Sequence, residues 1–156
     1  MAGRATTLAN AIVTALSAWG DLPVGCTVSR VRSVTHLIKD MPDDAAAQIA
    51  VIVSEVEDQS SRGDVAEDCT IGFAVIANCN SEAAADSDSW DELTEKLRDY
   101  LRINATFKNI ALGGTLGAQR KSVSTVVVCD ADMLDRSEVF VSVTEAVWFI
   151  SVANRG

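Results

Sequence analysis

The sequence has few of the residue types on which catalytic and metal sites most often depend. Its 156 residues include a single histidine, His36, and no nucleophile motif surrounds it. Because histidine is the side chain that most often transfers protons near neutral pH, we expect no enzyme active site. The cysteines lie in or beside apolar runs without CxxC spacing, which predicts buried thiols and no metal site. These cysteines are Cys26, Cys69, Cys79 and Cys129.

Long hydrophobic runs and excess positive charge are also missing. The longest apolar candidate, Val139 to Val152, is interrupted by polar residues, whereas a membrane helix needs about 20 apolar residues. The first residues lack the continuous apolar segment of a signal peptide. Thirteen Lys and Arg against 22 Asp and Glu give a net charge of −9, which opposes sequence-independent binding to DNA or anionic lipid. We therefore expect a soluble protein in a reducing cytosol.

Phosphate-binding and cation-binding motifs are not present in complete form. The glycines of Gly113 to Gly117 do not match GxxxxGK[ST], so the sequence predicts no nucleotide cofactor. The segment Asp130 to Asp132 resembles half of a cation loop but lacks the later Gly and Glu of an EF-hand. A solvated turn is the expected structure there, and no cofactor or metal is predicted.

Apolar periodicity predicts two helices and a set of strands. Leu8, Ile12, Leu16 and Trp19 form the stripe of an amphipathic helix that stops at Gly20. A capping box at Ser89 to Glu92 predicts the start of a second helix that runs to Leu101. Val and Ile content predicts strands over Cys26 to Val34, Ile49 to Val56, Cys69 to Ala77, Ser122 to Cys129 and Glu138 to Val152.

This order of elements predicts one α+β domain over residues 1–156, with a mostly antiparallel β-sheet, a long C-terminal strand and helices packed on one face. Two extended loops are expected, at 57–68 and 104–122. The first is polar and longer than a usual hairpin link, so it is a candidate for partner contact. The second contains glycines and three basic residues, so we expect a flexible, basic loop.

The last predicted strand is apolar on both of its faces, and two short helices cannot cover it. We expect part of it, including an exposed apolar edge, to pack against another copy of the chain. The candidate interface residues in this strand are Phe140, Trp148, Phe149 and Ile150. Those in the two loops are Arg62, Asp64, Lys108, Arg120 and Lys121.

Four of these features together resemble the tail terminator proteins of tailed bacteriophages. They are the N-terminal helix ending in Trp19, the strand pair split by Glu57 to Asp68, the capped helix Ser89 to Leu101 and the closing strand Val139 to Ile150. The family has a helix of the Asp-Glu-Leu, Leu-Arg type and a final strand with an Arg or Glu, apolar, Phe, apolar, Ser pattern. The matching segments here are Asp91 to Arg102 and Arg136 to Val143.

The resemblance implies a structural virion protein without catalytic residues. Such a protein forms a ring, usually hexameric, that caps the tail tube, stops its polymerisation and joins the tail to the head connector. Its partners would be further copies of itself, the tail tube protein, head connector or neck proteins and, in a contractile tail, the sheath. DNA would only pass through the ring. The location would be the tail or neck of the virion, and the host cytoplasm during assembly.

Three alternatives stay open at this point, and one of them, a regulatory oligomer unrelated to phages, would differ from the family resemblance only in its partner. The segment Asn104 to Ser122 is longer than in shorter relatives, so a head-completion or neck adaptor protein of the same phage neck fits the same pattern. A small-ligand-binding or enzymatic α+β domain would instead need a deep pocket that contains His36 or a carboxylate pair.

Overall fold

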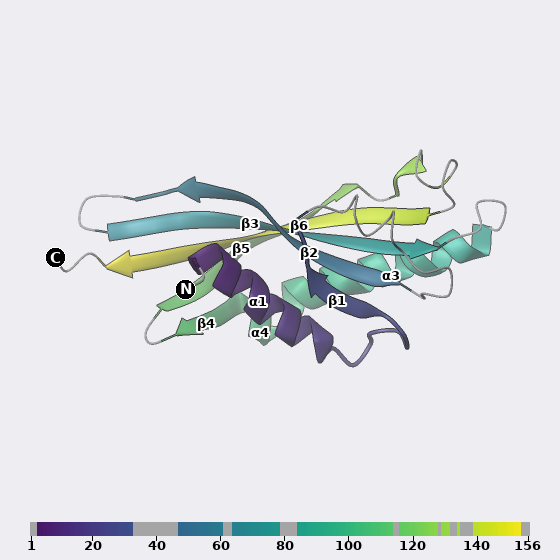
Figure 1. Cartoon of the computed structure of the whole chain (residues 1–156), viewed down its shortest axis with the longest axis horizontal. Coiled ribbons are helices and arrows are strands. Elements are labelled where there is room, and N and C mark those ends of the chain that lie inside the picture. The colour runs from purple at the N-terminus through teal and green to yellow at the C-terminus, as the bar shows by residue number, and fades with distance from the viewer. Residues whose placement is uncertain are drawn as a thin grey trace.

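The computed structural model describes residues 3–32, 47–60, 64–78, 84–113, 116–127, 129–131, 134 and 139–153. These residues form three helices and six strands (Figure 1). In chain order they are α1 (Arg4–Ser17), β1 (Thr27–Arg30), β2 (Gln48–Asp58), β3 (Asp64–Asn78), α3 (Ala84–Ile103), α4 (Ala105–Lys108), β4 (Asn109–Gly113), β5 (Leu116–Val127) and β6 (Val139–Ala153).

The strands form one sheet in the order β1-β2-β3-β6-β5-β4. Only β1 and β2 are parallel, and every other neighbouring pair is antiparallel. The predicted α+β class with a mostly antiparallel sheet is therefore confirmed. Strand β6 lies between β3 and β5 and is paired along both of its edges, so the prediction of an exposed edge on the last strand is wrong.

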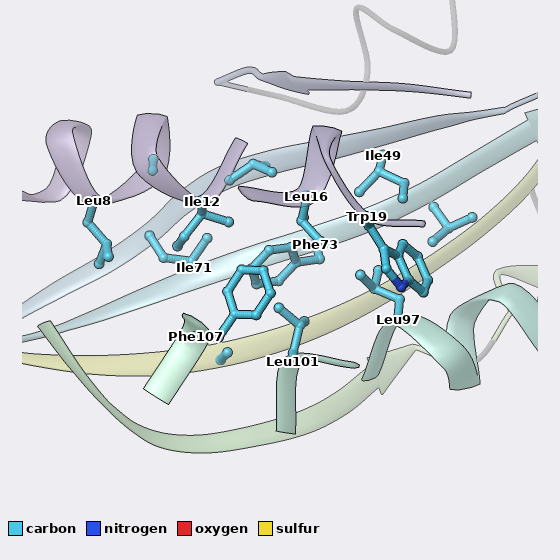
Figure 2. Close-up of a cluster of buried hydrophobic side chains, with 14 of the residues drawn as sticks. Leu8, Ile12, Leu16, Trp19, Ile49, Ile71, Phe73, Leu97, Leu101 and Phe107 are labelled. Atoms are coloured by element: carbon cyan, nitrogen blue, oxygen red, sulfur yellow. The ribbon is translucent and has the colours of Figure 1, made fainter. Parts of the chain in front are cut away.

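The main core lies on the side of the sheet that holds Phe73 and Trp148, which we call the inner face. The core side chains of the helices all belong to this one cluster, namely Leu8, Ile12 and Leu16 of α1, Leu97 and Leu101 of α3 and Phe107 of α4 (Figure 2). Aromatic rings extend it, because Trp19 stacks on Tyr100 with ring centroids 4.9 Å apart. Apolar burial of this kind is the largest favourable contribution to folding.

Polar contacts fix α3 on the sheet. Within the core, the hydroxyls of Thr94 and Ser142 are 2.7 Å apart and join α3 to β6. Arg98 donates from Nη1 to Thr125 Oγ1 at 3.0 Å, and Arg102 donates to the Val123 carbonyl at 3.1 Å. Helix α3 is therefore attached to both β6 and β5.

The second helix begins earlier than the capping box predicts. Helix α3 starts at Ala84, so Ser89 is an exposed residue within the helix and does not cap it. The acidic residues before Trp90 lie in the first turns, where the helix dipole favours negative charge. That preference allows the helix to extend beyond the predicted start.

The predicted loop at 57–68 belongs for the most part to a hairpin. Strand β2 continues to Asp58 and β3 begins at Asp64, with Glu57 opposite Asp68. The Asp58 carboxylate accepts a hydrogen bond from Ser60 N at 2.8 Å, which tightens the turn. Strand pairing overrides the low strand propensity of these polar residues, because each backbone group gains a ladder partner.

The predicted basic loop at 104–122 is also ordered secondary structure. It holds α4, β4 and the first part of β5, and Asn104 caps α4 by accepting from Thr106 N at 2.9 Å. Gly113 ends β4 with φ of 123°, a left-handed value that favours glycine. Gly113 therefore ends β4 in a conformation that suits glycine, and β4 pairs antiparallel with β5.

Candidate functional site

Strand β6 carries the residues for which a partner was predicted, and its two faces differ. Phe140, Trp148 and Ile150 point to the inner face and are fully buried within the single chain. The Trp148 indole donates from Nε1 to the Phe107 carbonyl at 2.9 Å, which satisfies its only donor. These three residues belong to the core, so they cannot serve as contact residues without unfolding.

The opposite side of the sheet, which we call the outer face, holds the odd-numbered residues of β6. A second, smaller cluster lies there around Ala74, Ile76 and Val141, and none of the helix residues that the structure describes belongs to it. Val139 and Val141 are buried, whereas Val147 and Phe149 stay partly exposed. The apolar stripe of β6 is thus covered at its beginning and open towards its end.

Phe149 lies in one row of residues across the outer face. The register places Asp68 of β3 on one side of it and Gln119 of β5 on the other. Lys121 Nζ reaches Asp68 Oδ2 at 2.7 Å, from a side chain that is 51% exposed. Asp68 itself is only 8% exposed, and its Oδ1 has no hydrogen-bond partner in the described part of the chain. Phe149 therefore has a buried carboxylate beside it.

Acidic residues border the open part of the stripe. Glu57 is opposite Asp68 and Glu55 is opposite Thr70, so both glutamates lie on the outer face. Glu145 of β6, opposite Gly72, interrupts the stripe between Val143 and Val147. The surface is therefore apolar at its centre and negative at its border.

The three basic contact residues predicted in the segment 104–122 do not form one cluster. Arg120 is opposite Trp148 on the inner side, where its Nη1 donates to the carbonyls of Leu101 and Arg102 at 2.5 and 2.6 Å. Lys121 faces Asp68 on the outer face, and Lys108 is exposed in the last turn of α4. Only Lys108 of the three has no ion pair or side-chain hydrogen bond within the described residues.

Several other predicted residues fall outside what the structure describes. His36, Cys79 and Arg62 lie outside the described residues, and for Asp64 only the backbone, at the start of β3, is described. Cys26 and Cys69 are buried, as predicted, and Cys129 is half-buried. Within the described ranges no three potential ligands come together for a metal, and no helix is long and apolar enough to cross a membrane.

The described surface has shallow hollows beside the helices. One of about 330 Å³ is lined by the stacked pair Trp19 and Tyr100, with the exposed Ile103 and the charged Lys96 and Asp99. Another, of about 360 Å³, is lined by Thr6, Arg30, Val31, Arg32 and Val53. Sequence reasoning missed Arg30 and Arg32, although two arginines alternating with valine and serine are typical of an exposed strand edge.

No protein-family model matches this sequence, and no curated protein matches it either.

Proposed function

We propose that this chain is a structural subunit that assembles into a ring and, as its resemblance to tail terminators implies, caps a phage tail tube. In this proposal the helices occupy the inner face of the sheet, and the long strand β6 presents its outer face to a neighbouring copy. The observation that carries the proposal is the partly exposed pair Val147 and Phe149 on the outer face. The apolar cluster of that face contains no residue of a described helix.

The energetics favour a large contact over a small one. Burying apolar surface contributes about 25 cal/mol per Å², so two side chains alone yield only a few kcal/mol. Stable protein interfaces cover about 800 Å² on each partner. The contact must therefore extend beyond Val147 and Phe149 onto the acidic residues around them, and those residues need partners of opposite charge.

The assembly test separates Phe149 from its buried neighbour. We expect the wild-type chain to form rings in size-exclusion chromatography with light scattering and in electron micrographs, and to shorten tubes formed by a tail tube protein. Phe149→Asp should fold, as judged by circular dichroism, but stay monomeric, because it places an unpaired charge in the contact. Trp148→Asp should fail to fold.

Val24→Asp is the matched control, because Val24 is an apolar residue that is 97% exposed in the link between α1 and β1. It should assemble like the wild type. A wild-type chain that is monomeric at every concentration and has no effect on tubes would contradict the proposal. Rings that bind a head connector and ignore tubes would instead favour the neck adaptor.

A further inference from the structure

Two arginines form a positively charged hollow beside β1. Arg30 is the last residue of β1 and Arg32 follows two positions later, and both side chains are exposed. They line the hollow of about 360 Å³ together with Thr6, Val31 and Val53. Arg30 donates from Nε to Asn10 Oδ1 at 3.0 Å, which holds its guanidinium in place. A held guanidinium fork is well suited to carboxylates.

Two glutamates on the outer face have the complementary charge. Glu55 and Glu57 are exposed, and neither has an ion pair with a described residue. They lie on the part of β2 that continues beyond its pairing with β1, which ends at Val51. In Figure 1 the hairpin of β2 and β3 extends past the N-terminus of α1 towards one end of the molecule. The glutamates are therefore accessible to another molecule.

The sheet separates the two charged groups within one chain. Arg30 is in register with Val51, whose side chain belongs to the inner core, and its guanidinium contacts α1. Glu55 and Glu57 lie on the outer face, in register with Thr70 and Asp68. Because the groups lie on opposite faces, each is placed to meet its counterpart on a different molecule.

We infer that Glu55 and Glu57 of one copy dock on the hollow of Arg30 and Arg32 of the next copy. The inference rests on the proposed function and gives its ring a specific contact. The two surfaces differ, so the contact is head-to-tail, and such contacts generate closed rings when the rotation between copies closes. Each copy has a net charge of −9, so copies repel one another overall and need local opposite charges to associate.

Charge exchange between copies tests this contact. Glu55→Lys with Glu57→Lys makes the acidic surface of the outer face basic. Arg30→Glu with Arg32→Glu makes the basic hollow acidic. We expect each double variant alone to elute as a monomer under conditions where the wild type forms rings. An equimolar mixture of the two should recover the ring mass. In alternating copies, the lysine surface of one variant meets the glutamate hollow of the other, and the unchanged glutamate surface meets the unchanged arginine hollow. The chain with all four changes should also form rings by itself.

Two control variants carry equal charge changes on exposed positions of the helices. Glu95→Lys with Asp99→Lys, and Lys96→Glu with Ala105→Glu and Thr106→Glu, should form rings like the wild type. Circular dichroism of every variant verifies that it folds.

The outcomes separate the inference from the function on which it rests. If the wild type forms rings and the double variants form them equally well, the inference is overturned and the ring proposal stands. Loss of rings without recovery in the mixture or in the fourfold variant also overturns the inference. A wild type that never assembles overturns both. If Arg30→Glu with Arg32→Glu abolishes binding to a double-stranded oligonucleotide and leaves the rings intact, the hollow serves nucleic acid and the inference is overturned.

Discussion

At the scale of single residues, burial sets the chemistry of two thiols. Burial raises the pKa of Cys26 to about 11, and burial together with the carboxylate of Glu67 raises the pKa of Cys69 to about 11. The ordinary value is 9.0. The folded chain therefore keeps both thiols protonated at a pH where the unfolded chain has already ionised them.

The sign of the resulting pH dependence follows from proton binding. Between the ordinary thiol pKa of 9.0 and the value of about 11 in the folded chain, the unfolded chain binds fewer protons than the folded chain. The free energy of unfolding therefore falls as pH rises from about 9 to about 11. The stabilisation by the protonated thiols is fully present below pH 9. Urea unfolding at about pH 8 and about pH 10 should show a lower midpoint at the higher pH. A variant with alanine at both positions should show a smaller decrease, and an equal decrease would contradict the assignment.

The residue scale also shows how neighbours in β6 take different roles. Trp148 is fully buried with its indole nitrogen bonded, whereas Phe149 next to it faces the other side of the sheet and is partly exposed. Alternation along a strand produces this difference, since successive side chains point to opposite faces. Substitutions at these two positions therefore test folding and the proposed assembly separately.

At the scale of elements, the end of α3 depends on Arg120. Its guanidinium donates to the carbonyls of Leu101 and Arg102, two of the carbonyls that a helix C-terminus leaves without helical partners. We expect Arg120→Ala to lower the free energy of unfolding by about 2 kcal/mol, because it removes charge-assisted hydrogen bonds from a partly buried site. Urea unfolding monitored by circular dichroism measures this change.

Two variants control the Arg120 experiment. Arg120→Lys keeps the positive charge near the helix end but loses the planar fork, so it should recover only part of the stability. Lys108→Ala removes an exposed basic residue of the same segment and should change stability by less than about 0.5 kcal/mol. Equal losses in Arg120→Ala and Lys108→Ala would show that the contact with α3 contributes nothing specific.

At the scale of the whole molecule, the proposed ring would link assembly to stability. If only folded chains can join a ring, ring formation stabilises the folded state, and the apparent melting temperature rises with protein concentration. We expect this increase for the wild type and for Val24→Asp, and its absence for Phe149→Asp. Differential scanning calorimetry over a hundredfold range of concentration measures it. A wild-type melting temperature that is independent of concentration would contradict a stable ring.

Sequence patterns predicted the elements that contain many apolar residues. The stripe Leu8, Ile12 and Leu16 predicted α1, and the apolar residues of β2 and β3 predicted the centre of the sheet. The strand residues 57–58 and 64–68 of the hairpin were missed because their mostly polar side chains are typical of loops, while their strand conformation comes from pairing between distant backbone groups. The same reason explains β4 and the beginning of β5.

The candidate site was only partly predictable. Phe149 and Lys121 were predicted and lie on the outer face, whereas the place of Glu55 and Glu57 beside them depends on the register of β2 against β3. Arg120 was predicted as a surface contact, and the structure directs it to the end of α3. A basic residue in a sequence does not reveal whether a helix end lies within reach of it.

The sequence by itself determined the class of fold, the amphipathic faces of the helices and the acidic charge of a chain without a catalytic motif, because composition and periodicity act locally. The tertiary structure decided which side chains remain for a partner. It placed β6 between two strands, buried Trp148, left Phe149 partly open and put Arg30 and Glu55 on opposite faces of one sheet. The physical reason is that exposure depends on strand order and register, which are set by contacts between residues far apart in the chain.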